Sequence, residues 1–323
     1  MLMSCERLAR ARLLVLMMVG LLGCVGSTPR PVEGPPAARE VPRIAVVTAF
    51  APELEALLPG LEAQSTEVLN GRTFHLGRLA GKDVVLFLSG VSTVNASMTV
   101  QLALTRFKVT HLVFSGIAGG VNPSLHIGDV TVPRQWANYQ EQAFARQVGP
   151  DTWQLQPWQT RDLGHFGMMF PQYSEVVRKG GTPDEREFKF WFDVDPRMLA
   201  VASALASRVQ LERCTTSGVC LKHEPRIEAG GRGVSGPTFV DNADYRTWVW
   251  NTFQDGSGRG VDALDMESSA VAQVAYTNGV PFIAFRSLSD LAGGGEGSNE
   301  MPIFFQLAAR NSAQVVRSFL EAL

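Results

Sequence analysis

The chain has 323 residues, of which 45% are hydrophobic and 19% are charged, with 31 glycines and 18 prolines. This length is enough for one large domain or two small ones. The formal net charge is −2, and the sequence has no basic run with interleaved aromatic residues, which argues against binding to nucleic acid. No cysteine–histidine spacing typical of a metal site occurs either, so we predict no bound metal.

The first 23 residues are predicted to be a signal peptide rather than part of the fold. Arg7, Arg10 and Arg12 precede the apolar run LLVLMMVGLLG, which is too short to cross a bilayer as a helix. The sequence LLGC at 21–24 resembles a bacterial lipoprotein signal. In such a signal Cys24 would be lipidated and become the first residue of the mature protein. The alternative is plain secretion. We expect a location in the bacterial cell envelope, facing the periplasm, with membrane contact only through the lipid anchor.

Residues 24–42 are rich in proline, glycine and small side chains, which is typical of a flexible tether. One folded domain is expected over 43–323. It contains two cysteines, Cys214 and Cys220, in the sequence CTTSGVC. In an oxidising compartment a disulfide between them is expected, and two free buried thiols are the alternative.

Apolar runs and helical spacings alternate along the domain. Strands are predicted at 43–50, 83–90, 111–115, 129–133, 261–266 and 280–290. Helices are predicted at 52–58, 93–107, 195–209, 267–279 and 302–323, and the segment 233–253 is expected to form a strand, a turn and a helix with Asp241 or Asn242 near its cap. The glycines at 116–120 are expected to form a loop after their strand.

This alternation predicts an α/β protein whose sheet is layered between helices. In such folds ligands bind beyond the carboxyl ends of the strands. Polar or small residues follow the predicted strands at Glu53, Ser89, Gly116–Gly120, Glu267 and Asp290. We therefore expect these positions to converge on one cleft.

Residues 134–193 differ from the rest of the domain. They hold many aromatic residues with scattered proline and glycine and show no sustained period. We expect a long ordered excursion from the core. A cover over the site, an extra packing layer and a subunit interface are the alternatives for its role.

The domain resembles the nucleoside phosphorylase/nucleosidase family, nearest to its methylthioadenosine/S-adenosylhomocysteine nucleosidases and to the branch of plant bark storage proteins. The motifs that carry the resemblance are VTAFAPELEAL, SGVSTVNA, SGIAGGVNPSLHIGDVTVP, GVSGPTFVDNADYR, VDALDMESSAVA and FRSLSDLAGGG. The resemblance implies a three-layer α/β/α sandwich with a central twisted mixed sheet. It also implies cleavage of the bond between ribose and base in a purine nucleoside, by a homo-oligomer for which a dimer is favoured.

The resemblance assigns the chemistry to three carboxylates. Asp290 would protonate N7 of the leaving purine, with a pKa raised by burial and with Ser289 orienting it. Glu53, just inside a predicted helix start, would be the base that activates a water molecule. Glu267 would accept hydrogen bonds from the ribose hydroxyls, with Met266 packed against the sugar. General acid and base catalysis each contribute about 10²–10⁴-fold.

The remaining site residues follow from the same resemblance. Phe239 would stack on the base and Val240 would offer backbone hydrogen bonds to its edge. Ser89 and Phe50 would line the sugar side, and Arg286 would hold a carboxylate or a water molecule. The alternatives are purely structural roles: a helix cap for Asp290, a core side chain for Phe239 and a salt bridge for Arg286. Asp265 would orient the loop.

The sequence favours hydrolysis over phosphorolysis. A phosphate dianion needs arginine side chains and backbone amides, whereas the segment TAFAPELE contains no arginine, and Phe114 and Ile117 stand where the family's phosphorylases have arginine and serine. We therefore expect a purine nucleosidase without a cofactor, and inorganic phosphate would be a co-substrate only in a phosphorylase. A non-catalytic nucleoside-binding or storage-like lipoprotein is the third alternative. Methylthioadenosine, adenosine, inosine and a cytokinin riboside all stay open as substrates.

Overall fold

The computed structural model describes residues 40–159 and 162–323. The first strand begins at Arg43. The predicted signal peptide, Cys24 and all but the last three residues of the predicted tether lie outside the described residues. In the described ranges no helix is both long and apolar enough to cross a bilayer.

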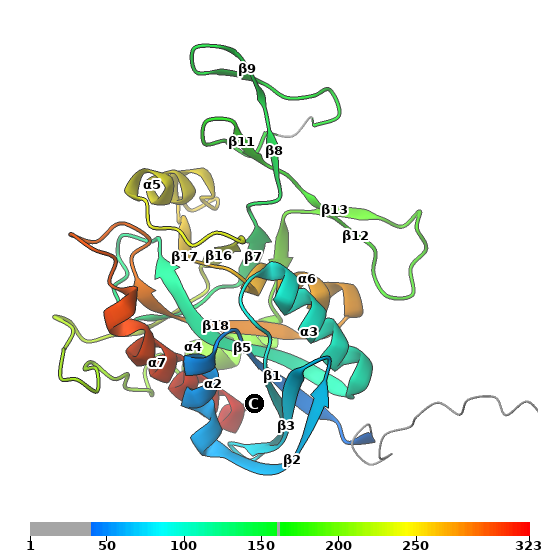
Figure 1. The fold of residues 1–323 in the computed structure, drawn as a ribbon, viewed down its shortest axis with the longest axis vertical. Coiled ribbons are helices and arrows are strands. Elements are labelled where there is room, and N and C mark those ends of the chain that lie inside the picture. The colour runs from blue at the N-terminus through cyan, green and yellow to red at the C-terminus, as the bar shows by residue number, and fades with distance from the viewer. Residues whose placement is uncertain (1–39, 160–161) are drawn as a thin grey trace, which may run out of the picture. The chain divides into compact units, whose positions relative to one another are not determined.

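A mixed sheet forms the centre of the fold (Figure 1). Along it the strands run in the order β14-β7-β16-β17-β5-β1-β4-β3-β2, while β18 pairs with β5 and β6, and β15 pairs with β6. The neighbours β1–β4, β1–β5 and β5–β18 are parallel, whereas β3 is antiparallel to β2 and β4, and β17 is antiparallel to β5. Its strands are β1 (Arg43–Thr48), β2 (Leu61–Leu69), β3 (Arg72–Leu79), β4 (Lys82–Leu88), β5 (Val109–Gly120), β6 (Val130–Val132), β7 (Gln135–Asn138), β14 (Trp191–Asp193), β15 (Ile227–Ala229), β16 (Arg232–Ser235), β17 (Val261–Asp265) and β18 (Phe282–Asp290).

Helices cover both faces of this sheet. They are α2 (Ala51–Leu57), α3 (Thr93–Arg106), α4 (Pro196–Ala204), α5 (Ala243–Thr252), α6 (Ser268–Asn278) and α7 (Met301–Ala322), with a short 3₁₀ turn at Leu58–Gly60. In β1, Ala45 and Val47 pack in one apolar cluster with α3 and α6, while Ile44 and Val46 pack in another with α4 and α7. Side chains of a strand alternate between the two faces, so the three-layer mixed architecture is confirmed.

The helix boundaries follow the expected local signals. Asn242 caps α5, because its side chain accepts a hydrogen bond from the backbone N–H of Tyr245. Gly279 ends α6 with a left-handed φ of 69°, a conformation that costs glycine little.

The expected glycine loop at 116–120 is wrong. These glycines extend β5, which stays paired with β18 as far as Gly119 and with β17 at Gly119 and Gly120. The strands β17 and β18, together with side chains such as Glu53 and Arg286, satisfy the backbone polar groups of this segment. The hairpin of β2 and β3 was not predicted. Asn70 and Gly71 turn it, both with positive φ (48° and 72°).

The segment 134–193 begins and ends inside the central sheet, as β7 and β14 pair with each other at its edge. Trp136 and Phe192 from these strands are fully buried. Between them the described residues form three two-stranded sheets, and β8, β9 and β11 extend away from the central sheet (Figure 1). These strands are β8 (Gln142–Phe144), β9 (Arg146–Gly149), β10 (Thr152–Gln154), β11 (Met169–Pro171), β12 (Ser174–Val176) and β13 (Glu187–Lys189).

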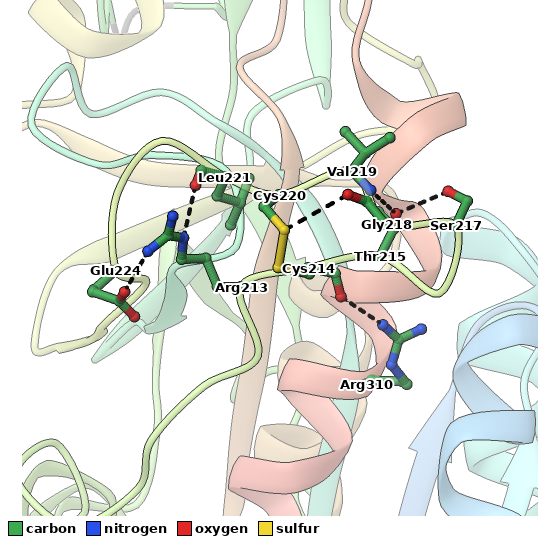
Figure 2. Close-up of a disulfide and its surroundings, with 10 residues drawn as sticks. All are labelled: Arg213, Cys214, Thr215, Ser217, Gly218, Val219, Cys220, Leu221, Glu224 and Arg310. Atoms are coloured by element: carbon green, nitrogen blue, oxygen red, sulfur yellow. Dashed lines mark hydrogen bonds and ion pairs between the residues drawn. A yellow bond between two sulfur atoms is a disulfide. The ribbon is translucent and has the colours of Figure 1, made fainter.

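Cys214 and Cys220 form a disulfide in a surface loop beside α7 (Figure 2). Both residues are exposed, which differs from the alternative of two buried thiols. The same loop is held by hydrogen bonds from Arg213 Nε to Leu221 O (2.9 Å) and from Arg310 Nη2 to Cys214 O (3.3 Å).

We expect the double substitution Cys214→Ser and Cys220→Ser to lower the free energy of unfolding by at most about 2 kcal/mol, because the bond closes only a short loop. Activity should be unchanged, since neither residue lines the cavity described below. Urea unfolding with and without a thiol reductant measures the effect. A loss of activity in the folded double variant would contradict this expectation.

Candidate active site

A cavity of about 230 Å³ opens at the carboxyl ends of β1, β5, β17 and β18. It is bordered by the segments that precede α2 and α5 and by the first residue of α7. Its lining residues are Ala49, Phe50, Glu53, Val91, Ile117, Ala118, Gly119, Thr238, Phe239, Val240, Leu264, Asp265, Met266, Glu267, Ser289, Asp290 and Met301. All of them lie in the described ranges, and none is lysine, arginine or a residue of 134–193.

Glu53 lies at one side of this cavity and is buried. Its carboxylate accepts backbone hydrogen bonds from Ala49 (2.6 Å), Phe50 (3.3 Å) and Ile117 (2.9 Å). The second of these bonds satisfies the backbone N–H of Phe50, the N-cap residue of α2. Burial raises the pKa of Glu53, while Arg286 and the three backbone donors act to lower it. The side chain is therefore a fixed, proton-accepting group with a pKa above its ordinary value.

Glu267 lies between β17 and α6 and is also buried. It accepts a hydrogen bond from the backbone N–H of Ser92 (2.7 Å), whose φ of 80° is unusual for a residue with a side chain. Burial raises the pKa of Glu267 to about 8; Arg286 opposes this shift, and the nearby charge of Asp265 adds to it.

Asp290 ends β18 at the other side of the cavity. Its carboxylate accepts hydrogen bonds from the hydroxyl of Ser289 (2.9 Å) and the backbone N–H of Ala292 (2.8 Å). Burial raises the pKa of Asp290, and these donors partly oppose the shift. The expected orienting contact of Ser289 is thus present in the structure.

The cavity also brings together Phe50, Met266, Phe239 and Val240. Val240 is buried, whereas Phe239 is 53% exposed, so Phe239 stands at the mouth rather than in the core. Ser89 is placed differently from the expectation, because it is not a lining residue and its hydroxyl donates to the carbonyl of Gly90 (3.0 Å).

Arg286 lies behind the cavity wall and is fully buried. Its guanidinium is within ion-pair distance of Asp265 (2.7 Å), Glu267 (3.4 Å) and Glu53 (3.7 Å). It also lies 4.0 Å from the centroid of the Phe114 ring, a cation–π arrangement.

Gly116 has a role that the sequence reasoning missed. A Cβ atom there would lie 2.1 Å from Arg286 Nη1 and 2.6 Å from Glu53 Oε1. The backbone of β5 therefore approaches the two charged groups as closely as only glycine permits. A signal was present in the sequence, since an isolated glycine inside a strand marks such an approach.

We expect Gly116→Ala to lower the free energy of unfolding by about 1–3 kcal/mol, the usual cost of forcing an atom into a packed interior, and to reduce activity by displacing Glu53. Thermal unfolding and turnover measure both effects. Gly149→Ala is the control, because its Cβ would be 3.7 Å from the nearest atom. An unchanged Gly116→Ala protein would contradict the close approach.

Comparisons with known proteins identify the family of this chain. A profile of the phosphorylase superfamily matches residues 43–321. The 5′-methylthioadenosine/S-adenosylhomocysteine nucleosidase of Bacillus thuringiensis (strain Al Hakam) is 28% identical over 282 residues, which cover 87% of this chain and 99% of that protein.

Solved structures share the fold. The S-adenosylhomocysteine nucleosidase of Streptococcus pyogenes, in complex with 5-methylthiotubericidin, matches with a TM-score of 0.62 at 25% identity, over 87% of this chain and 97% of its own. The futalosine hydrolase of Helicobacter pylori strain 26695 matches with a TM-score of 0.62 at 20% identity, over 89% and 99%.

The mixed sheet and the buried acidic cavity at its strand ends define an α/β protein of the nucleoside phosphorylase fold. The chain belongs to the phosphorylase superfamily. Its expected likeness to the plant storage branch stays a prediction.

Proposed function

We propose that this protein is a purine nucleosidase, which hydrolyses the bond between ribose and base in adenosine-type nucleosides. One observation carries the proposal: three buried carboxylates, Glu53, Glu267 and Asp290, line a single cavity. The similarity to nucleosidases over 87% of the chain supports it.

The roles of the carboxylates follow from what the reaction requires. A purine leaves poorly as an anion, so an acid must protonate it, and the raised pKa of Asp290 favours the protonated form that such an acid needs. Glu53 accepts a proton from the attacking water, and Glu267 accepts hydrogen bonds from the ribose hydroxyls. Met266 and Phe50 supply apolar contact with the sugar, and Phe239 covers the base.

Water is favoured over phosphate as the nucleophile. A phosphate dianion would lie beside the carboxyl groups of Glu53 and Glu267, and a cation would be needed to offset the repulsion from their ionised forms. None of the lining residues is lysine or arginine. Arg286 already forms ion pairs with three carboxylates. We therefore propose no cofactor and no requirement for inorganic phosphate.

The substrate is proposed to be adenosine or 5′-methylthioadenosine. The second compound is part of the name of the Bacillus relative. Phe50, Val91 and Met301 give the cavity an apolar lining, which suits a nucleoside whose 5′ substituent is not charged.

The test is release of adenine from both nucleosides by the purified protein, with and without phosphate. Release without phosphate supports the nucleosidase. Release only with phosphate would identify a phosphorylase instead. Binding of nucleoside without release of base would favour the non-catalytic alternative.

We further propose that the chain is a lipid-anchored protein of the bacterial cell envelope, facing the periplasm, with Cys24 as the modified residue. The lipoprotein-like sequence at 21–24 supports this location. Cys24→Ala should release the protein from the membrane fraction, and unchanged fractionation would contradict the anchor.

A homo-oligomer, with a dimer favoured, is also proposed. Val94 and Met98 of α3 are 68% and 64% exposed, and they lie close along the chain to the cavity residue Val91. Exposed apolar side chains gathered on one element are typical of an interface. Sedimentation of the purified protein decides between monomer and dimer.

A further inference from the structure

We propose that Asp265 is a positioning residue, which acts through Arg286 to hold Glu53 and Glu267 in their working geometry and charge state. The proposal rests on the proposed hydrolysis of a nucleoside, and it adds a residue to which the similarity assigned no more than loop orientation.

Asp265 makes the shortest ion pair of Arg286. Its Oδ2 lies 2.7 Å from Arg286 Nε, compared with 3.4 Å for Glu267 and 3.7 Å for Glu53. The Nε–H itself donates to the hydroxyl of Ser268 (2.9 Å), and Asp265 Oδ2 accepts no hydrogen bond in the described residues. Attraction between charges, rather than a directed hydrogen bond, therefore joins Asp265 and Arg286.

Asp265 is itself held in place. Its Oδ1 accepts hydrogen bonds from the Ser235 hydroxyl and from the backbone N–H groups of Glu267 (3.2 Å) and Ser268 (3.1 Å). The Ser235 oxygen in turn accepts from the backbone N–H of Ser269 (2.8 Å). The carboxylate is thus fixed between β16 and the first turn of α6.

The Asp265 carboxylate and the Ser268 hydroxyl together hold the Nε end of the guanidinium. With Nε donating to Ser268 beside Asp265, Nη1 faces Glu53 and donates to the carbonyl of Ile117 (3.2 Å), while Nη2 faces Glu267. The Nε end of Arg286 therefore pairs with Asp265, which has no part in the proposed chemistry. The Nη1 and Nη2 end faces Glu53 and Glu267.

The charges around Arg286 do not balance. If all three carboxylates were ionised, one buried cation would face three anions. A like charge nearby disfavours ionisation, so the charge of Asp265 acts to keep a proton on Glu267. The charge of Asp265 also acts on Tyr139, because it helps to raise the pKa of the Tyr139 hydroxyl.

Asp265→Asn tests the proposal because it keeps the shape and removes the charge. Without that anion Glu267 ionises more easily, so the limb of the kcat–pH profile that depends on Glu267 should move to lower pH. Arg286 also loses its anchor, so kcat at the plateau should fall about 10–100-fold, as misplaced reacting groups do, with KM within about twofold. Asp265→Glu, which restores the charge, should return the limb toward its original pH.

Asp262→Asn is the matched control. Asp262 is equally buried in β17 and pairs with Arg259 (2.6 Å) away from the cavity. It should lose stability without moving the pH limb. If Asp265→Asn likewise only loses stability, and the pH dependence of kcat does not change, Asp265 has only a structural role and the proposal is overturned.

A second readout does not need activity. Carboxyl carbons of labelled glutamate, followed by NMR, report the titration of Glu53 and Glu267 directly. Midpoints that move to lower pH in Asp265→Asn support the positioning role, and unmoved midpoints overturn it. If the wild-type protein releases no base, the proposed function is contradicted, but the role of Asp265 is not. The NMR titration still tests that role.

Discussion

Asp290→Asn is expected to reduce release of adenine by about 10²–10⁴-fold, the range in which a general acid contributes. Asparagine keeps the shape of the side chain, and its single carbonyl oxygen can still accept from Ser289 or from Ala292, which donate to different oxygens of Asp290, but it has no proton to give to the leaving base. Binding of a nucleoside should stay within a few-fold of the wild type. Turnover and equilibrium binding, measured side by side, test both expectations.

Asp244→Asn is the control for this substitution, because Asp244 is an exposed residue in the first turn of α5 and should leave turnover unchanged. The wild-type rate should also fall as the pH rises through the raised pKa of Asp290, since only the protonated acid acts. A variant that releases adenine at the wild-type rate would remove Asp290 from the chemistry.

Glu267→Gln is expected to make the protein more stable than the wild type at alkaline pH while reducing its activity. The pKa of Glu267 is about 8 in the folded protein against 4.5 as its ordinary value. A raised carboxyl pKa adds stability that is fully present below the ordinary value and is lost as the pH rises through the folded value. Glutamine has no proton to lose, so it avoids this loss.

The stability difference between Glu267→Gln and the wild type should therefore grow from pH 5 to pH 8, reaching on the order of 4 kcal/mol, since each pH unit between the two pKa values corresponds to about 1.4 kcal/mol. Urea unfolding at several pH values measures it. Glu55→Gln, at an exposed position of α2, should show no such trend. A constant difference would mean that Glu267 does not hold a proton in the folded state.

The sheet and the placement of the three carboxylates were predictable from the sequence, because each depends on local signals. Continuous apolar runs mark strands buried on both faces, and residues after parallel strands meet at one edge. That rule alone placed Glu53, Glu267 and Asp290 near one another, and the structure puts all three in one cavity.

Other features depend on contacts that a linear pattern does not contain. The β2–β3 hairpin has a mostly exposed strand, so its apolar alternation is weak, although Asn70-Gly71 is a strong hairpin signal. The extension of β5 through its glycines depends on β17 and β18, which lie more than a hundred residues further along the chain. The pairing of Asp265 with Arg286 likewise joins two strands whose register no local pattern sets.

The continuity of β5 has a consequence for turnover. Ile117 of this strand donates its backbone N–H to Glu53, and Gly119 pairs with Asp290, so one strand, paired with β18 throughout this stretch, spans the two ends of the cavity. A paired strand has no hinge, and the two carboxylates keep a constant separation. Binding of the nucleoside and release of the free base must then depend on movement at the other border of the cavity, at Phe239 and Met301. Amide hydrogen exchange should be fast there and slow in β5, and the rate of that opening would set the upper bound on the turnover rate.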